Sequence, residues 1–343
     1  MKIGGRSRKF AKKVFSTPPT MGPGAARLRG GEAWRAGRDA GRSRVAAGHE
    51  RVSVGATSTC VRWSGRRTPR REAGGTSDGL RVLRRSRVSY FAVFDGHGGA
   101  RASQFAAEHL HQNLGKKFPS GKAENVDALI RKCLVDTFRQ TDEDFLKKAS
   151  SQKPAWKDGS TATCMLAVDD VVYVANLGDS RAVLCRTEAP GGGAGHRKWM
   201  TLALSKEHNP TIYEERMRIQ RAGGTVRDGR VLGVLEVSRS IGDGQYKRCG
   251  VISTPNLKRC QLTANDRFII LACDGLFKVF SADEAVKFVL GVLQEEGSKE
   301  EEGQRYDAAC QRLATEAVRR GCADNVTVIL VSVGFDRSSS VSQ

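Results

Sequence analysis

The sequence lacks the long apolar runs of membrane proteins and the cysteine spacing of disulfide-stabilised or zinc-binding proteins. No stretch of its 343 residues approaches the roughly 20 consecutive apolar residues of a membrane span. No secretory leader pattern follows the first residue. The nine cysteines are odd in number and irregularly spaced, and none form a C-x-x-C pair. They indicate reduced thiols in a cytoplasmic and/or nuclear protein rather than a disulfide framework.

Acidic residues are scarce in the N-terminal quarter of the chain. Residues 1–89 contain 22 Lys and Arg but only 5 Asp and Glu, whereas residues 90–343 contain 35 and 32. Most of the net charge of +20 therefore lies in this first segment. The segment is rich in Arg, Gly, Ala and Ser and has no sustained apolar period, so residues 1–87 are predicted to be a mostly disordered basic tail.

The charge of this tail favours anionic partners. Its acid-free start has features of a mitochondrial transit peptide or a nuclear-localisation patch, and a solvated tail is the simpler interpretation. No aromatic interleaving or known module supports nucleic-acid binding beyond non-specific contacts. The tail therefore does not by itself indicate a function.

The character of the sequence changes at Val88, and the stretch YFAVFDGHGG from Tyr90 to Gly99 is the most informative in the chain. Its short aromatic and β-branched run predicts a buried strand that ends at Asp95. A carboxylate at a strand end can point into a cleft, and the glycines that follow let the backbone turn sharply near an ion or a phosphate. A helix is predicted from about Ala100 to Leu114.

Three more acids stand next to predicted strands or turns. Asp274 ends an apolar run, Asp324 precedes the last one, and Asp179 lies in a Gly-Asp-Ser turn. A lone Asp at a strand end is usually a turn former or a helix cap. If these strands share one sheet, however, the carboxylates converge. Oxygen-only ligands suit Mg²⁺ or Mn²⁺ rather than Zn²⁺.

Strands cluster in the middle of the chain and helices flank them. Three short strands at about 161–168, 171–175 and 182–185 are predicted to form an antiparallel meander. Helices are predicted at about 126–146, 213–221, 282–293 and 306–320. This mixture indicates an α+β domain.

Six short motifs occur in the order found in one enzyme family. They are FDGHGG (94–99), DGSTA (158–162), GDSRA (178–182), SRSIGD (238–243), ACDGLF (272–277) and ADNVTV (323–328). Through them the chain from Arg87 to Gly334 resembles the metal-dependent type-2C protein serine/threonine phosphatases. The resemblance implies two antiparallel β-sheets packed face to face with helices on both outer sides. It also implies hydrolysis of phosphoserine and phosphothreonine by water activated on Mg²⁺ or Mn²⁺.

The resemblance also assigns site residues. It implies metal ligands at Asp95, which would bridge two ions, at the Gly96 carbonyl, at Asp274 and Asp324, and, for a weaker third ion, at Asp179. His97 is the candidate general acid, because an imidazole titrates near neutral pH. The alternative is a hydrogen-bonded histidine packed in a turn.

The upstream sequence departs from the family. Members carry, before the strand that ends at Asp95, another strand with a phosphate-binding arginine and an acidic pair, one acid of which ligates the second metal. Residues 60–89 show no such pattern. N-terminal strands are therefore expected to be missing, the second metal site incomplete and the activity impaired. Arg181 and Arg239 could contact phosphate, although structural ion pairs are the commoner use of such arginines.

The predicted organisation is a basic tail at 1–87, a phosphatase-like domain at 88–335 and a flexible C-terminus at 336–343. A monomer that acts on phosphoprotein substrates is expected, and the resemblance names integrin-linked kinase as a candidate partner. One alternative is a catalytically weak or inactive regulatory protein of integrin-linked-kinase signalling that keeps the scaffold for binding. A nucleic-acid-binding protein that depends on the tail is another.

Overall fold

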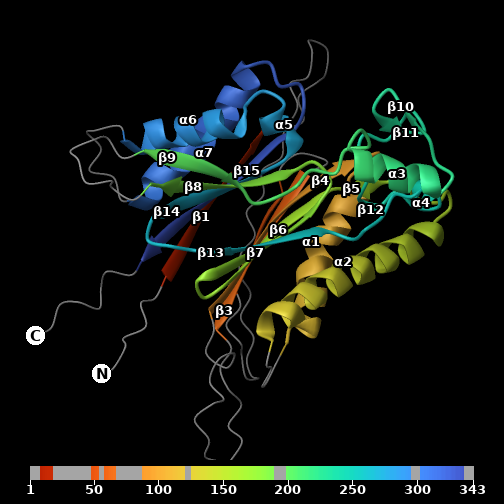
Figure 1. Ribbon diagram of the computed structural model, residues 1–343, viewed down its shortest axis with the longest axis horizontal. Helices are drawn as coiled ribbons and strands as arrows, with labels where there is room; N and C mark the ends of the chain where they lie inside the picture. The colour runs from red at the N-terminus through yellow and green to blue at the C-terminus, as the bar shows by residue number, and fades with distance from the viewer. Residues whose placement is uncertain are drawn as a thin grey trace, which may run out of the picture.

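Two antiparallel β-sheets form the centre of the protein, and helices cover the outer face of each (Figure 1). The computed structural model describes residues 8–17, 48–53, 58–66, 87–119, 125–188, 198–294 and 302–335. The five-stranded sheet has the order β1 (Arg8–Thr17), β15 (Val326–Phe335), β14 (Asp266–Ala272), β8 (Arg181–Thr187), β9 (Trp199–Ala203).

The larger sheet has eight strands. Its main path runs β12 (Ile241–Gly242), β5 (Gly159–Ser160), β4 (Arg87–His97), β6 (Ala162–Val168), β7 (Val171–Leu177), β13 (Asn256–Gln261). Strand β3 (Ser58–Arg66) also pairs with β4, and β2 (Gly48–Ser53) pairs with β3. Strand β4 therefore lies inside the sheet, and the end of β4 that carries Asp95 has neighbouring strands on both sides.

The residues of β4 alternate between two cores because successive side chains of a strand point to opposite faces. Tyr90 and Phe94 pack in the layer between the sheet and the helices α1 (Arg101–Lys117) and α2 (Val126–Ser150). Phe91 and Val93 pack in the layer between the two sheets, where Ile269 of the other sheet also lies. All five side chains are buried. A strand that is apolar on both faces thus marks the middle of a sandwich.

Two pairs of helices cover the sandwich from outside. Helices α1 and α2 pack on the larger sheet, and α6 (Ala282–Gln294) and α7 (Glu302–Arg319) pack on the five-stranded sheet, as Figure 1 shows. Ser281 begins α6 with a capping box, since its hydroxyl accepts from the Glu284 N–H and its own N–H donates to the Glu284 carboxylate. The predicted fold class, two antiparallel sheets between outer helices, is confirmed.

The predicted meander is correct only in its first half. Strands β6 and β7 pair with each other, but β8 pairs with β14 of the other sheet. The chain changes sheets at Gly178, whose φ of 101° favours glycine, and a Cβ there would lie 2.7 Å from Cγ2 of Thr161. This crossing places Asp179 at the end of the sandwich rather than in a hairpin loop.

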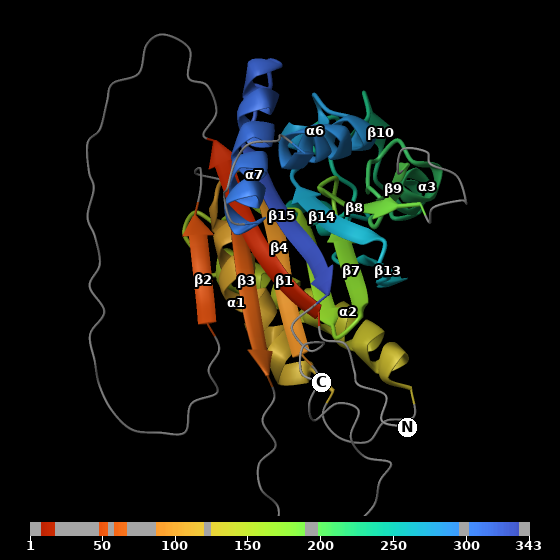
Figure 2. The same ribbon diagram turned by 90° about the vertical axis from the view of Figure 1, so that its left-hand side faces the viewer.

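The expectation of missing N-terminal strands is wrong. Strands β1, β2 and β3 all lie within residues 8–66; Figure 2 shows β1 along β15, and β3 between β2 and β4. Strand β3 pairs with β4 from Ser58↔Asp95 to Arg66↔Arg87. The physical reason is that unpaired backbone groups along β4 and β15 favour any strand that can hydrogen-bond to them. The folded part therefore begins before Val88, and the rest of 1–86 and 336–343 lies outside the described residues.

The described cysteines are free thiols, as their irregular spacing predicted, and the described helices include no candidate membrane span. The eight cysteines from Cys133 onward are free thiols, and six of them are buried. Among the residues that the structure describes, no helix is both long and apolar enough to cross a membrane.

A buried ion-pair network holds the helix α3 (Tyr213–Arg221) against the SRSIGD motif. Glu215 is 3% exposed and accepts hydrogen bonds from Arg239, Arg218 and the Ser238 hydroxyl. Burial by itself would raise the pKa of the Glu215 carboxyl, but these donors outweigh it and hold that pKa well below its usual range. Arg239 thus forms a structural ion pair with Glu215, which is the commoner role of arginines in such motifs.

Glu215→Gln is expected to lower the free energy of unfolding by about 2–3 kcal/mol at pH 7, because it leaves two partly buried guanidinium groups short of one counter-charge. Since the pKa of Glu215 is depressed in the folded state, its contribution is present at neutral pH and is lost as the pH falls below the usual glutamate range. Urea unfolding at pH 7 and at pH 3.5 measures both effects. Glu214→Gln, an exposed neighbour on the same helix, is the control and should change little. An equal effect of the two substitutions would contradict this reading.

Candidate active site

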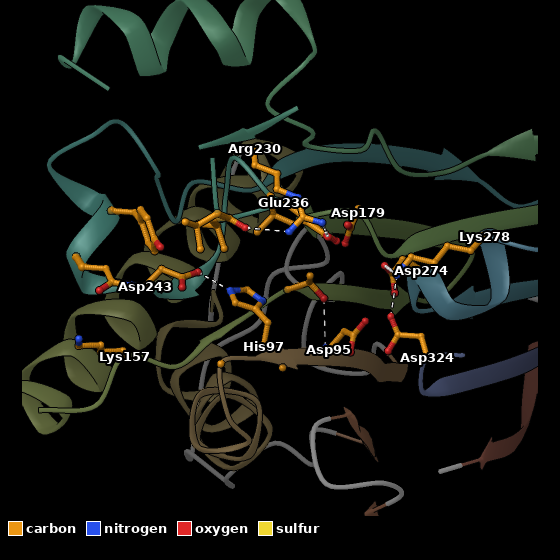
Figure 3. Close-up of a pocket in the computed structure, with 18 residues that line it drawn as sticks. Asp95, His97, Lys157, Asp179, Arg230, Glu236, Asp243, Asp274, Lys278 and Asp324 are labelled. Carbon is orange, nitrogen blue, oxygen red and sulfur yellow. Dashed lines mark hydrogen bonds and ion pairs between the residues drawn. The ribbon is translucent and has the colours of Figure 1, made fainter. Parts of the chain in front are cut away.

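The four chain segments that carry the predicted site residues meet at one end of the sandwich, where they form part of the wall of a cavity of about 440 Å³ (Figure 3). They are the end of β4, the turn between β7 and β8, the start of the short helix α5 (Asp274–Phe277), and Asp324, two residues before β15. All six residues predicted for the site line this cavity: Asp95, Gly96, His97, Asp179, Asp274 and Asp324. The sequence motifs thus converge in space.

Asp95 is fixed by the strand next to it. Its N–H donates to the Thr161 hydroxyl at 3.2 Å, and its carbonyl accepts from the Thr161 N–H at 2.8 Å. Gly96 pairs in register with Ser160 of β5. The DGSTA motif therefore supports the FDGHGG motif through backbone contacts, which hold the Asp95 carboxylate at the cavity wall.

The carboxylates of Asp95, Asp274 and Asp324 lie close together. One ligand atom each of Asp95, Cys273 and Asp274 fall within 4.8 Å of one another. The Oδ2 atoms of Asp274 and Asp324 are each 2.7 Å from the Lys278 ammonium. The predicted convergence of the three carboxylates is confirmed, and their role as metal ligands stays a prediction.

The donor set fits a hard divalent cation. Burial raises the pKa of the Cys273 thiol well above its ordinary value, and this thiol is hydrogen-bonded to backbone groups of Asn325 and Thr327, so the oxygens remain as ligands. Oδ1 of Asp274 is buried without a hydrogen-bond partner in the described part of the chain. A buried carboxylate oxygen without a donor is costly, and a cation would satisfy it.

Asp179 lines the same cavity and lies near Asp274. Burial and then the nearby Asp274 carboxylate raise the pKa of Asp179 to about 7. Its ionised form is therefore unfavourable until a cation compensates it. This behaviour is typical of carboxylates that share a binding site for a positive ion.

In metal-free protein, Asp179→Asn is expected to raise the free energy of unfolding at pH 8 by an amount on the order of 2 kcal/mol. The Asp179 pKa is raised from 3.8 to about 7 in the folded state, so the native chain loses stability as the pH rises through that window. The two proteins should therefore have similar stability near pH 4. Urea unfolding in EDTA measures the difference. Asp228→Asn removes an exposed charge from a second cavity that Asp179 also borders, and it serves as the control; a pH-independent difference would refute the prediction.

His97 is held by an acid that sequence reasoning did not select. Its Nε2 lies 2.6 Å from Oδ2 of Asp243, which is 2% exposed and has a left-handed φ of 53°. Burial lowers the pKa of His97, but the hydrogen bond and charge of Asp243 raise it more, so the net shift is upward. The pair leaves Nδ1 as the ring nitrogen available to a substrate.

Gly159 allows the pair to form. A Cβ at this position would lie 2.1 Å from Oδ2 of Asp243 and 2.2 Å from Nε2 of His97. The available signal for Asp243 was its place as the last residue of the SRSIGD motif. Local spacing could not show that it reaches His97, which lies 146 residues away.

The arginines that were candidate phosphate contacts are paired with acids. Arg239 forms an ion pair with Glu215, and Nε of Arg181 lies 2.5 Å from Oε1 of Glu207. The basic residues that line the cavity in the described part of the chain are Lys157, Arg230 and Lys278. Strand β3, which lies next to β4, contains no acidic residue, and Ser58 is opposite Asp95 in the register.

Comparison with known proteins identifies the family. The family model for protein phosphatase 2C matches residues 53–326. The chain belongs to the protein phosphatase 2C family. The match begins before β3, so the domain extends upstream of the boundary predicted at residue 88.

Close relatives of the chain are serine/threonine phosphatases by name. It is 67% identical over 255 residues to the integrin-linked kinase-associated serine/threonine phosphatase 2C of Bos taurus. The aligned region covers 73% of this chain and 68% of the relative. Identity to the protein of the same name from Homo sapiens is also 67%, over 64% of that protein. The probable protein phosphatase 2C 67 of Oryza sativa is 42% identical over 71% of this chain and 66% of the relative. The chain thus spans about two thirds of the length of these relatives.

Solved structures agree with this assignment. A sex-determining protein of C. elegans matches with a TM-score of 0.60 and 25% identity, over 80% of this chain and 64% of the other. A serine-threonine phosphatase 2C of Toxoplasma gondii matches with a TM-score of 0.60 and 21% identity, over 84% and 99%, which supports the fold alone. The sequence-based identification as a type-2C phosphatase is confirmed.

Proposed function

We propose that this protein phosphatase 2C chain hydrolyses phosphoserine and phosphothreonine in proteins with water activated by Mg²⁺ or Mn²⁺. The observation that supports this best is the meeting of Asp95, Asp274 and Asp324 in one cavity with His97. Asp95, the Gly96 carbonyl, Asp274 and Asp324 would hold the metal, and Asp179 would help to hold a weaker one. When bound, the ion would lower the pKa of a coordinated water and offset charge on the phosphoryl group.

His97 and Asp243 of the protein would supply a proton to the leaving group. His97, with Nε2 engaged by Asp243, presents Nδ1 to the cavity. A protonated imidazole at this place can donate its proton to the leaving alkoxide of serine or threonine, which is a poor leaving group. Asp243 stabilises the imidazolium and fixes the ring, so it acts as a positioning residue.

Asp95→Asn and Asp274→Asn should each abolish Mn²⁺-dependent release of phosphate from a phosphothreonine peptide, because each removes a carboxylate that the metal would share. Far-UV circular dichroism should remain unchanged, since neither side chain is part of a core. Asp283→Asn, an exposed acid on α6, is the matched control and should keep the native rate. Turnover that persists in EDTA, or in either variant, would disprove the metal-dependent mechanism.

Asp243→Asn tests the proton donor. Asparagine tolerates a left-handed φ, so the backbone should be retained. We expect kcat on a phosphothreonine peptide to fall about 10²-fold, because the imidazolium loses its partner. On p-nitrophenyl phosphate, whose leaving group needs no proton, the loss should be only a few-fold. His97→Gln should show the same discrimination, and the double variant should be no worse than His97→Gln. Equal losses on both substrates would instead indicate a structural role for Asp243.

The level of activity remains a second question, because β3 carries no acid opposite Asp95. If no other acid replaces the missing ligand, the second metal site is incomplete, and turnover should need high Mn²⁺ and rise with pH. The alternative of a catalytically weak member of the family predicts this behaviour. The full chain assayed over a Mn²⁺ series separates the two, since near-normal activity at low millimolar Mg²⁺ would exclude the weak form.

The partners are part of the same proposal. A phosphatase of this family acts on phosphoproteins, and the relatives' name, integrin-linked kinase-associated, suggests integrin-linked kinase as a partner. The monomeric state and the cytoplasmic and/or nuclear location stay predictions.

A further inference from the structure

Lys278 is a charged residue of the cavity that the mechanism above does not use. It follows α5 directly, and its backbone N–H donates to the Asp274 carbonyl at 2.7 Å. Its ammonium lies 2.7 Å from Oδ2 of Asp274 and 2.7 Å from Oδ2 of Asp324. Figure 3 shows Lys278 beside these two acids, at the opposite end of the cavity from Lys157. One cation of the chain itself therefore binds two of the proposed metal ligands at once.

The position of this ammonium conflicts with a shared metal ion. Divalent ions bind carboxylate oxygens at about 2.0–2.6 Å, close to the 2.7 Å that the ammonium keeps from each Oδ2. The other Asp324 oxygen, Oδ1, accepts a hydrogen bond from the Asn325 N–H. Both oxygens of this carboxylate therefore already have a donor while Lys278 stays in place. Two cations held by the same pair of carboxylates would also repel each other strongly. A metal that takes the Oδ2 atoms of both Asp274 and Asp324 must therefore displace the ammonium, which leaves only Oδ1 of Asp274 without a partner among the described residues.

The side chain has a route by which to leave. The Lys278 side chain is 47% exposed, and it borders both the main cavity and the adjoining cavity of about 320 Å³. Its four-carbon stem can swing the ammonium into water without movement of the backbone. Displacement then exchanges two partly exposed ion pairs for metal coordination, at a modest cost.

We propose that Lys278 is a built-in competitor for the divalent cation, which neutralises Asp274 and Asp324 in the metal-free protein and thereby raises the metal concentration needed to load the site. The inference rests on the proposed function, because it takes these two acids as metal ligands. It gives this chain an internal control on metal occupancy. The simpler alternative is that Lys278 forms surface ion pairs that stabilise the end of α5 and have no effect on metal binding.

Calorimetric titration of the full chain with Mn²⁺ separates the two. Lys278→Met keeps the length and apolar stem of the side chain but removes the charge. It should tighten the Mn²⁺ Kd about tenfold, which corresponds to loss of a competitor worth about 1.4 kcal/mol. Lys157→Met is the matched control: it removes one positive charge from the same cavity, and in the described part of the chain Lys157 forms no ion pair with either acid. It should change the Kd less than threefold. Equal changes in the two variants, or weaker binding by Lys278→Met, would overturn the proposal.

Thermal unfolding gives a second readout. In EDTA, Lys278→Met should melt at a lower temperature than the native chain, because two carboxylates lose their counter-charge. In saturating Mn²⁺ the difference should disappear or reverse. An equal deficit in both conditions would assign Lys278 a purely structural role. If the native chain binds no Mn²⁺ at all, the proposed metal-dependent function fails together with this inference; if it binds Mn²⁺ and Lys278→Met binds no tighter, only the inference fails.

Discussion

The mutual repulsion of aspartates at one end of the sandwich is the constraint on which the rest of the site depends. Asp95, Asp179, Asp274 and Asp324 line one cavity, and burial together with Asp274 raises the pKa of Asp179 to about 7. Such a cluster is tolerated only if positive charge compensates it. Lys278 supplies part of that charge from within the chain, and a divalent ion is proposed to supply the rest. The site can therefore be understood as a balance between anions fixed by the fold and cations that exchange.

Close packing, rather than chemistry, explains several of the motif residues. Asp158 of the DGSTA motif accepts from the N–H and guanidinium of Arg101 at the start of α1, so it caps that helix and lies away from the metal ligands. A Cβ at Gly99 would lie 2.2 Å from Oδ2 of Asp158. Gly159 has the same relation to His97 and Asp243. The glycines of these motifs thus let charged groups approach the backbone, and a larger side chain would force the site apart.

The upstream strands show that strand pairing does not require an acid next to Asp95. Strand β3 pairs along nearly the whole of β4, and the family match already begins at residue 53. Backbone pairing depends little on side-chain identity, so a strand without acids can occupy this place. Metal ligation does depend on side-chain identity, and the residue paired with Asp95 in the register, Ser58, has no carboxylate. Strand pairing and metal ligation therefore place different demands on β3.

The sequence by itself determined the elements with a strong local period and the motifs with a specific chemistry. Helix α3 was predicted at 213–221 and is found at Tyr213–Arg221, and the burial of the strand before Asp95 followed from its unbroken apolar run. Tertiary structure alone decided which strands pair, and so moved β8 into the second sheet and placed β1 and β3 beside β15 and β4. It alone brought Asp243 to His97 and Lys278 to Asp324. Periodicity records which face of an element is buried, whereas pairing and charge contacts join residues far apart in the chain, whose proximity no local pattern encodes.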